Sequence, residues 1–488
     1  MKTGFDNEKY LKIQSEHIKE RISNFEGKLY LEFGGKLFDD YHAARVLPGF
    51  APDSKLKMLL QLKDESEVVI AISAEDIERN KKRGDLDIGY DEDVLRLVGN
   101  FRDRGLFVNS VVITRFTPSP AVNQFKQRLE RKKIKVYKHY SIEGYPNNVP
   151  FIVSDKGYGK NEYIETTRPL IIVTAPGPGS GKMATCLSQL YHENKRGIKA
   201  GYAKFETFPV WNLPLKHPVN LAYEAATADL NDVNMIDPFH LSAHGETAVN
   251  YNRDVEIFPV LSATFESIYG ESPYKSPTDM GVNMIGKCIT DDEVCKEASR
   301  QEIIRRYFKA REALMRESGS EKEVYKIELI MKQENITPSD RSVVDPARER
   351  AKKEGKPAIA IELPDGKIIT GGTTKLLGAS SAGILNALKE LAGIPHKTHL
   401  IAPSAIEPIQ RLKIEYLGSQ NPALHTDETL IALSMSAATD ENARLAMEQL
   451  PKLRGCEIHT SVMLAHVDLK MFQKLGIQLT SEAVQEKK

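Results

Sequence analysis

The segment from Arg168 to Glu193, RPLIIVTAPGPGSGKMATCLSQLYHE, holds residue types that could bind a phosphate group. Its apolar run LIIVTA is typical of a parallel strand that is buried on both faces. A Gly/Pro loop with one lysine, Lys182, follows it and leads into a helical pattern. Glycines allow a close approach of the backbone, and a helix that starts near Gly181 directs free N–H groups and its positive dipole end toward the loop. The segment therefore predicts a strand, an anion-binding loop and a helix.

The loop supplies two kinds of phosphate ligand. The backbone N–H groups of Gly177, Gly179, Ser180 and Gly181 could bind phosphate oxygens. The ammonium group of Lys182 could neutralise charge on the terminal phosphate as it is transferred. The plainer alternative is a Gly/Pro turn with a solvated lysine.

The loop departs from the P-loop frame G-x-x-x-x-G-K-[ST] at two positions. Pro176 replaces the first glycine, and Met183 replaces the Ser or Thr that ligates magnesium. Thr185 lies roughly 200° round the helix from Met183, so it cannot simply take that role. A nucleotide could still bind here, either with magnesium held by other residues or without magnesium.

A second frame fits the loop more closely. Val173-Thr174-Ala175, then Gly181-Lys182-Met183, then AGYAKFETFP from Ala200 resemble the phosphate-binding region of dethiobiotin synthetase and related amide-forming ATPases. That resemblance implies that Lys204 lies beside the phosphates and that Glu206 is a candidate magnesium ligand. With Lys182, these residues would carry out an ATP-dependent group transfer or ligation.

A separate polar segment, Ala225 to Glu246, could hold a metal ion. Its candidate ligands are Asp229, Asp232, Asp237, His240 and His244. His240 and His244 are one helical turn apart, which suits a metal pair if the segment is helical. Pro238 and the many Asn and Asp residues favour a loop instead. A polar surface loop and a metal-dependent active site are both open interpretations.

Other polar clusters lie beside glycines. The segment 371–389, GGTTKLLGASSAGILNALK, is a second loop before a helix, in which Ser380 or Ser381 is a predicted N-cap and Lys375 could meet an anion. An ordinary capped helix is the alternative. Further clusters, with no defined role, are Glu32, Lys36, Asp39, His42 and Arg45 around Gly34-Gly35, Arg253 with Asp254, and Lys275 with Asp279.

The elements that position these residues alternate between strands and helices from the amino terminus to Pro209. Predicted strands cover residues 28–35, 107–116, 135–142, 170–175 and the starts of 67–84 and 200–209, with helices at 6–25, 91–105 and 121–134. This alternation implies a largely parallel sheet with helices on both faces. We expect an α/β, P-loop or Rossmann-like region, followed by an irregular stretch at 205–274.

Two domains are expected. Residues 1–336 form the amino-terminal α/β region, which includes a helical hairpin at about residues 275–336. Residues 337–357 combine prolines with dense charge and are predicted to be a linker. Residues 358–488 form a smaller, three-layer α/β/α domain, with strands predicted at THLIAP and CEIHTSV.

The composition narrows the class of protein. The 488 residues include 67 basic and 67 acidic ones, so no net charge attracts nucleic acid or a membrane surface. Four scattered cysteines without a CxxC pair indicate a reducing compartment. No apolar run approaches the roughly 20 residues of a membrane span, and the charged amino terminus does not resemble a signal peptide. We expect a cytoplasmic protein, as a single chain or a homo-oligomer, that binds a phosphorylated small molecule.

Several segments together resemble a bacterial family defined by domain of unknown function number 1846. They are YLEFGGKLFDDYHAARVLPGF, TAPGPGSGKMATCLSQLYHE, SPTDMGVNMIG and LGASSAGILNALK, together with the long segment that starts at GYAKFETFP. The resemblance covers nearly the whole chain and implies a large amino-terminal region with a smaller α/β carboxy-terminal domain. Some relatives carry the label ATP-dependent peptidase, but no G-x-S-x-G elbow, H-E-x-x-H helix or reactive-cysteine context is present.

The leading hypothesis is a protein that binds ATP or another phosphorylated small molecule at Gly177–Lys182 and uses it for group transfer or ligation. Magnesium would be held by Glu206, Asp229 or Asp232. One alternative is a metal-dependent enzyme that uses Asp237, His240 and His244. Another is a non-catalytic protein that binds a nucleotide or sugar phosphate, which the missing magnesium ligand at Met183 keeps open.

Overall fold

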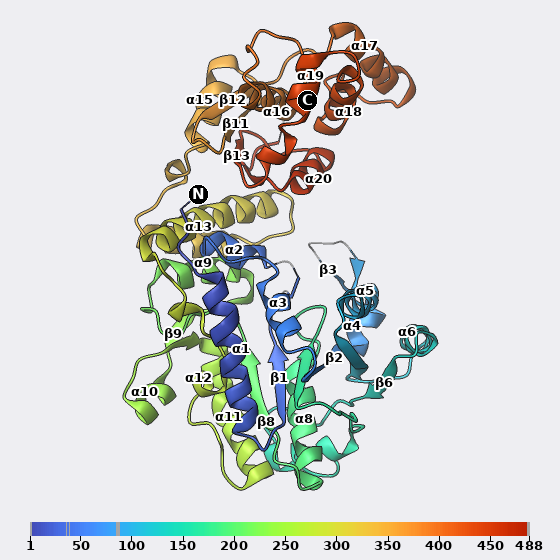
Figure 1. Cartoon of the computed structure of the whole chain (residues 1–488), viewed down its shortest axis with the longest axis vertical. Coiled ribbons are helices and arrows are strands. Elements are labelled where there is room, and N and C mark those ends of the chain that lie inside the picture. The colour runs from blue at the N-terminus through green and yellow to red at the C-terminus, as the bar shows by residue number, and fades with distance from the viewer. Residues whose placement is uncertain (1, 36, 39, 84–87, 486–488) are drawn as a thin grey trace. The chain divides into compact units, whose positions relative to one another are not determined.

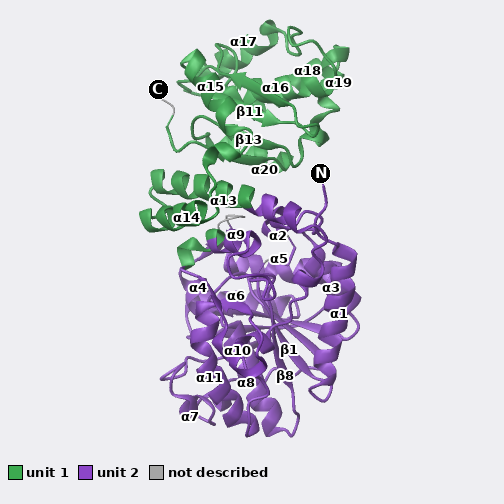
Figure 2. Cartoon of the chain, turned by 90° about the vertical axis from the view of Figure 1, so that its left-hand side faces the viewer, with its two compact units in different colours: residues 1, 225–230, 300–488 green, residues 2–224, 231–299 purple. Residues whose placement is uncertain are grey.

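A computed structural model describes residues 2–35, 37, 38, 40–83 and 88–485 (Figure 1). Lys36 and Asp39 of the predicted polar cluster therefore lie outside the described residues. The chain divides into two compact units (Figure 2). Unit 2 comprises residues 2–224 and 231–299, and unit 1 comprises residues 1, 225–230 and 300–488. Each unit is built around its own sheet.

A six-stranded parallel sheet forms the core of unit 2. Its strands, in spatial order, are β6 (Lys135–Lys138), β5 (Phe107–Thr114), β2 (Ser66–Ser73), β7 (Leu170–Thr174), β1 (Leu29–Phe33) and β8 (Gly201–Phe205). Every residue of β1, β2 and β7 is buried, as expected of parallel strands covered on both faces. The α/β class and the parallel sheet predicted from the sequence are confirmed.

The strand order places β7 between β2 and β1, although β7 follows β6 in the chain. The connection from β2 to β5 runs toward one edge of the sheet, and the connection from β7 to β8 runs toward the other. Right-handed crossovers in opposite directions put their helices on opposite faces. A crevice at the carboxyl ends of β2 and β7 is the usual ligand position in such sheets.

Helices cover this sheet. Those that lie between or before its strands are α1 (Asn7–Ser23), α2 (Tyr41–Val46), α3 (Ser54–Gln61), α4 (Ala74–Glu78), α5 (Tyr90–Asp103), α6 (Pro120–Arg131), α7 (Val149–Ile152) and α8 (Lys182–Lys195). The short strands β3 (Lys82–Arg83) and β4 (Ile88–Gly89) pair beside α5. α1 packs on α3 and touches β8, whereas α8 packs on β1, β7 and β8 and contacts α11 (Asn252–Tyr269).

The stretch 205–274 is more regular than predicted. It contains α9 (Pro218–Ala226), β9 (Asn234–Ile236), α10 (Pro238–His244), β10 (Val249–Tyr251) and α11. The expectation of a loop at Pro238 is wrong, because Pro238 occupies the first turn of α10 and Asp237 caps it by accepting from the N–H groups of Phe239 and His240. A proline is well accommodated there, since its missing N–H would have no partner within the helix.

Unit 1 holds a smaller mixed sheet. Its order is β12 (Ile368–Gly372), β11 (Ala358–Glu362), β13 (Glu457–Thr460) and β14 (Gln478–Ser481). β11 is antiparallel to β12 and β13, and β14 is parallel to β13. Along β11, Ile359 and Ile361 enter the core cluster that includes residues of α16 (Ala379–Leu391), whereas Ala360 packs with Ala347 of α15 (Val344–Glu354). The alternation gives helices on both sides of the sheet.

The remaining helices of the chain include α12 (Pro277–Met280), α13 (Asp292–Met315), α14 (Glu321–Gln333), α17 (Pro403–Arg411), α18 (Thr426–Ser436), α19 (Glu441–Met447) and α20 (His466–Leu475). The predicted strand THLIAP is wrong, because this segment forms no strand and places Leu400 and Ile401 in the core as part of a loop.

The charged segment 337–357, predicted to be a linker, forms a 3-10 turn (Pro338–Asp340) and α15. Between them Arg341, only 1% exposed, forms an ion pair with Glu457 of β13 at 2.6 Å. Arg341 also donates to the carbonyl groups of Ile458 and Gln478. The segment is thus fastened to the sheet of unit 1.

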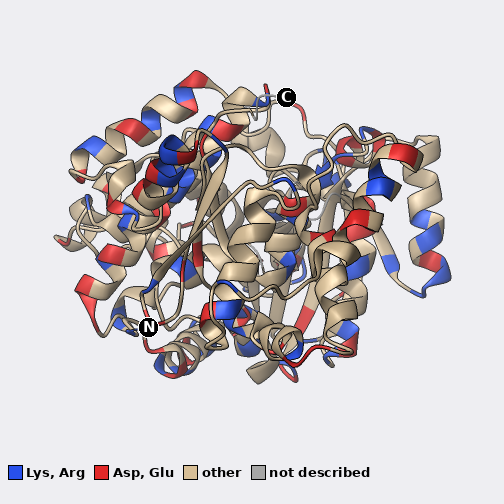
Figure 3. Ribbon diagram, turned by 90° about the horizontal axis from the view of Figure 1, so that it is seen from above, with Lys and Arg blue, Asp and Glu red and all other residues tan. Residues whose placement is uncertain are grey.

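Basic and acidic residues are equal in number, 67 of each. Basic and acidic residues alternate along many of the helices in Figure 3. The four cysteines are free thiols, and all are buried. Among the described residues, no helix combines the length and apolar character that crossing a bilayer would require.

Candidate phosphate-binding site

The loop between β7 and α8 has a conformation that depends on glycine. Gly181, the residue before α8, has a φ of 87°. A Cβ at Gly181 would also lie 2.9 Å from Cγ2 of Thr114, and a Cβ at Gly177 would lie 2.1 Å from the hydroxyl oxygen of Tyr90. The sequence therefore uses glycine where the backbone is left-handed and where side chains of β5 and α5 approach the loop.

The carbonyl groups of this loop are held by hydrogen bonds from within the protein. The carbonyl of Gly177 accepts from Ser180 Oγ at 2.9 Å, and the carbonyl of Gly179 accepts from Arg115 at 2.8 Å. The carbonyl of Ser180 accepts from Thr114 Oγ1 at 2.8 Å. The carbonyl of Gly181 accepts from both the N–H and the hydroxyl group of Thr185, at 3.0 and 2.9 Å. The hydroxyl of Thr185 is thereby bonded to the backbone, which agrees with the expectation that Thr185 does not replace the magnesium ligand missing at Met183.

The N–H groups of the loop are not paired in this way. In the part of the chain that the structure describes, the N–H groups of Gly177, Gly179, Ser180 and Gly181 donate no hydrogen bond, nor do those of residues 182–184. Pro178 and Gly179 are exposed, and Gly181 is half-buried, so solvent reaches the loop. Donors at the start of a helix with no side-chain cap are positively polarised, which suits an anion.

Lys182 lies at the edge of a charged cluster whose other members are Glu32, Lys204, Glu206 and Asp254. Its side chain is 15% exposed, and its Nζ is 4.0 Å from Oε1 of Glu32, a distance at the limit of an ion pair. Glu32 lies near the carboxyl end of β1, in register with Val173 of β7 and Lys204 of β8. Its other oxygen accepts from the hydroxyl of Tyr202 at 2.7 Å.

Lys204 occupies the centre of the cluster. Its Nζ is 2.6 Å from Asp254 Oδ2 and 2.8 Å from Glu206 Oε1. Burial alone would lower the pKa of Lys204, but Asp254, Glu206 and Glu32 outweigh that effect and raise it above its usual value. Lys204 therefore stays charged and is shared between two carboxylates.

The pKa of Glu206 is raised above the usual value of a glutamate. Burial raises its pKa, and the negative charge of Asp254 adds to this effect, while Lys204 opposes it; the result is a pKa of about 7. A carboxyl group that titrates near neutral pH can gain or lose a proton during a reaction. Such shifts concentrate at functional sites, although ion-pair networks also produce them.

The predicted catalytic residues Lys182, Lys204 and Glu206 thus lie together at the carboxyl edge of the sheet, linked through Glu32. Glu32 and Asp254 were noted in the sequence only as members of polar clusters. Their contribution could not be read from composition, because it depends on β1 lying between β7 and β8.

The predicted metal ligands are not all brought together. Asp237 is occupied as the cap of α10, and Asp232 forms an ion pair with Arg253 at 3.2 Å. Asp229 belongs to unit 1. There the pKa of Glu323 is raised, first by the burial of Glu323 and then by the negative charge of Asp229. Only His240 and His244 of the predicted set lie close enough to share an ion, and their third partner is Asp279.

The second predicted anion site has a different geometry from the one expected. α16 begins at Ala379, with Gly378 rather than Ser380 or Ser381 as its N-cap. The hydroxyl of Ser381 donates to the carbonyl of Leu424 at 2.8 Å, and Ser380 is buried in the first turn. Lys375 is exposed. The expectation of a serine cap is therefore wrong, because Gly378 already has the extended conformation of a cap.

The fold and the site together define a parallel α/β protein with a glycine-rich loop at the carboxyl edge of its sheet and a second, mixed-sheet domain. The chain belongs to the family described as Domain of unknown function DUF1846, whose amino-terminal model matches residues 3–335 and whose carboxy-terminal model matches residues 339–488. Membership of this family confirms the resemblance inferred from the sequence.

Relatives from other bacteria match over nearly their whole lengths. A UPF0371 protein of Corynebacterium aurimucosum is 60% identical over 99% of this chain and 97% of its own length. A UPF0371 protein of Streptococcus pyogenes is 56% identical over 99% of this chain and 98% of its own length. These matches span both parts of this chain.

Proposed function

We propose that this protein binds a nucleotide or another phosphorylated small molecule at Gly177–Lys182 and uses it in an ATP-dependent group transfer or ligation. The observation that carries the proposal is the contrast between the carbonyl groups and the N–H groups of the loop. Four carbonyl groups accept hydrogen bonds from within the protein, while the N–H groups of the same residues have no acceptor among the described residues. Phosphate oxygens are acceptors only, so they complement such a surface.

The position of Lys182 supports a ligand with more than one phosphate group. Lys182 is the first residue of α8 and directly follows the loop, and the contact of its ammonium group with Glu32 is long. A phosphate bound to the amides would offer Lys182 a closer counterion than Glu32 does. Lys182 would then stabilise negative charge that develops on a transferred phosphoryl group.

The carboxylates beside the loop fit magnesium. Met183 offers no oxygen ligand, and the Thr185 hydroxyl is bonded to Gly181. Glu206, Glu32 and Asp254 are oxygen donors of the type that magnesium prefers. When bound, magnesium would neutralise charge on the phosphates, and Glu206 would be its first candidate ligand or a proton acceptor for the incoming group.

The test is ligand-induced stabilisation of the full-length protein, measured as the shift in melting temperature with ATP and with glucose 6-phosphate, each with and without Mg²⁺. At a hundredfold excess over Kd, a ligand stabilises the folded state by about 2.7 kcal/mol. Lys182→Ala should remove most of the shift. Because the side chain of Lys182 is only 15% exposed, the substitution also removes packing, so the shift of each variant is taken relative to its own ligand-free melting temperature.

Lys195→Ala is the matched control, because Lys195 lies on the same helix and is exposed. It should respond like the wild type. If Lys182→Ala also responds like the wild type, the loop is not the binding site. A shift with ATP but no turnover of ATP with a panel of acceptors would overturn the catalytic half of the proposal and leave a nucleotide-binding protein.

A further inference from the structure

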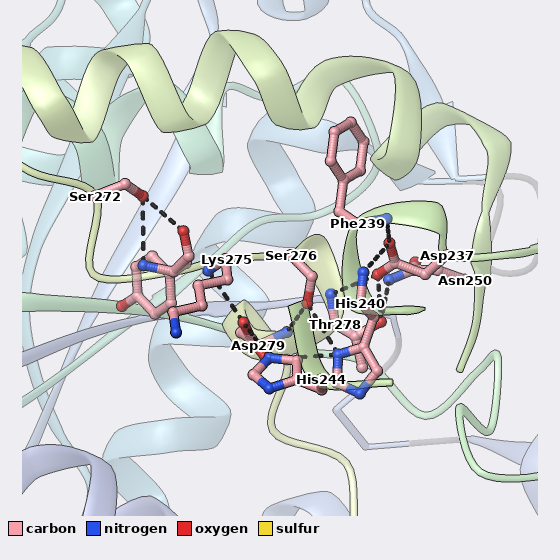
Figure 4. A network of polar contacts seen from close by, with 12 residues as sticks. Asp237, Phe239, His240, His244, Asn250, Ser272, Lys275, Ser276, Thr278 and Asp279 are labelled. Carbon is pink, nitrogen blue, oxygen red and sulfur yellow. Dashed lines mark hydrogen bonds and ion pairs between the residues drawn. The ribbon is translucent and has the colours of Figure 1, made fainter. Parts of the chain in front are cut away.

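Two short helices outside the glycine loop bring three metal-ligating side chains together (Figure 4). His240 and His244 lie one turn apart on α10, and Asp279 lies on α12. One potential ligand atom from each residue lies within 4.8 Å of the other two. We propose that His240, His244 and Asp279 form a binding site for a single Zn²⁺ ion.

The distances fit a tetrahedral ion. His244 Nε2 is 3.0 Å from Asp279 Oδ1, and His240 Nδ1 is 3.5 Å from the same oxygen. Zinc bonds to nitrogen and oxygen of about 2.0–2.2 Å separate tetrahedral ligand atoms by about 3.4 Å. These two separations lie on either side of that value, and the ligand atoms of the two histidines lie within 4.8 Å of each other, so side-chain rotations would have to bring them closer around the ion.

The backbone around the cluster is fastened by its own hydrogen bonds. One oxygen of Asp237 caps α10, and the other accepts from the N–H and hydroxyl groups of Thr278 in α12. Ser276 caps α12 and lies 3.0 Å from His240 Nδ1 (Figure 4). Asp237 therefore serves to join the two helices rather than to bind the metal. The contact between Ser276 and His240 Nδ1 has to give way when this nitrogen binds the ion.

The cluster keeps one side toward solvent. The side chain of His240 is 10% exposed, and that of His244 is 36% exposed. Three protein ligands with an accessible fourth position leave room for water or a ligand group. Two histidines and a carboxylate present nitrogen and oxygen donors, a set that suits zinc better than magnesium or calcium, which prefer oxygen alone.

A helix can supply two ligands to zinc when two histidines lie four residues apart on the same face. The sequence contains this spacing, but Pro238 made a loop the plainer interpretation. The carboxylate comes from thirty-five positions further along the chain, and only the packing of α10 on α12 reveals it. The site shares no residue with the glycine loop, so the zinc proposal does not rest on the proposed function.

The experiment uses untagged full-length protein, stripped of metal and titrated with Zn²⁺ alone by calorimetry at neutral pH. Co²⁺, titrated in parallel, reports a tetrahedral nitrogen and oxygen site through its visible absorption. We expect one strong equivalent of Zn²⁺, and affinity weakened roughly 10- to 100-fold or more in His244→Ala and in Asp279→Asn. Circular dichroism and the metal-free melting temperature check that both variants are folded.

His396→Ala is the matched control, because His396 is 57% exposed and also lies beside a carboxylate, Glu390, at 3.4 Å. It should bind Zn²⁺ as the wild type does. Equal zinc affinity in the wild type and in both site variants would overturn the proposal, as would the absence of a strong equivalent in the wild type. In either case the histidines and Asp279 would form a hydrogen-bonded network only.

Discussion

The ammonium group of Lys204 and the carboxylate of Asp254 are 2.6 Å apart, which joins the end of β8 to the first turn of α11. The two residues lie fifty positions apart in the chain. Both side chains are largely buried, so neither can exchange its partner for water at low cost. Their contact fixes the wall of the charged cluster beside the glycine loop.

Asp254→Asn should destabilise unit 2. The variant leaves Lys204 with Glu206 as its one close carboxylate, and Glu206 then ionises more readily. We expect the free energy of unfolding to fall by about 1–3 kcal/mol, because a buried charge loses part of its compensation. Urea unfolding followed by the fluorescence of Trp211, the single tryptophan and a residue of unit 2, measures the change.

Glu256→Gln provides the comparison, because Glu256 lies on the same helix but is exposed. Its effect should stay within about 0.5 kcal/mol. Equal destabilisation by both substitutions would show that the Lys204–Asp254 pair has no special weight.

Glu206→Gln should change how stability depends on pH. The pKa of Glu206 is about 7 in the folded protein, against a usual value of 4.5. The folded state therefore binds the extra proton between these two values, and the free energy of unfolding falls as pH rises through that range. Glutamine at position 206 does not titrate, so the variant lacks this fall in the free energy of unfolding.

The stability of Glu206→Gln relative to the wild type should accordingly improve by about 1–2 kcal/mol between pH 5 and pH 8. Unfolding at both pH values measures the difference. A relative stability that stays constant, or that declines toward pH 8, would mean that Glu206 carries its charge throughout.

Two glycine substitutions separate backbone strain from crowding in the loop. Gly179 has a φ of 79° with open space around it, whereas Gly181 has a φ of 87° with Thr114 against it. Gly179→Ala should cost about 1 kcal/mol, the strain of a left-handed alanine. Gly181→Ala should cost at least about 1 kcal/mol more, because Thr114 must move and releases the Ser180 carbonyl.

Thermal unfolding of both variants tests this order, and ATP-induced stabilisation tests its consequence for binding. Gly181→Ala should lose more of the ligand response than Gly179→Ala. The reverse order in either measurement would contradict the described loop conformation.

His139 should make unit 2 sensitive to acid. It is buried, with 3% of its surface exposed, and its Nε2 donates to the carbonyl of Glu162 at 3.1 Å. Burial lowers its pKa from 6.5 to about 4, with His192 adding to the shift and the Glu162 carbonyl opposing it. The unfolded chain therefore takes up a proton first as pH falls, and stability is lost below about pH 6.5.

Between pH 7 and pH 5 this single group should cost the wild type about 2 kcal/mol. His139→Gln, which keeps a donor for the Glu162 carbonyl, should be less stable at pH 7 but should lose less on acidification. Parallel urea titrations at the two pH values give the comparison, and an equal loss in both proteins would assign the acid sensitivity to other groups.

Much of the sheet was predictable because its strands are short apolar runs separated by amphipathic helices. The strand order was not predictable, because no residue of the segment LIIVTA indicates that β7 lies between β2 and β1. That insertion brings Glu32 beside Lys182, so the charged cluster was only half visible in the sequence. Locally, Lys182 and the glycines could be assigned to one loop because they are contiguous.

The errors have local causes. In the sequence Pro238 favours a loop, although a proline in the first turn, preceded by a capping Asp237, begins a helix well. The run THLIAP has the apolar character of a strand, yet its apolar residues fill the core of unit 1 without pairing. Asp279 is visible in the sequence only as a polar neighbour of Lys275, because the two histidines beside it lie on a different helix.

The inward hydrogen bonds of the loop carbonyls also bear on kinetics. A loop that is already held by Thr114, Arg115 and its own Ser180 has little conformational entropy left to lose when an anion arrives. Encounter should therefore be governed by diffusion and charge rather than by a slow closing motion, and the observed association rate should rise in proportion to ligand concentration without reaching a plateau.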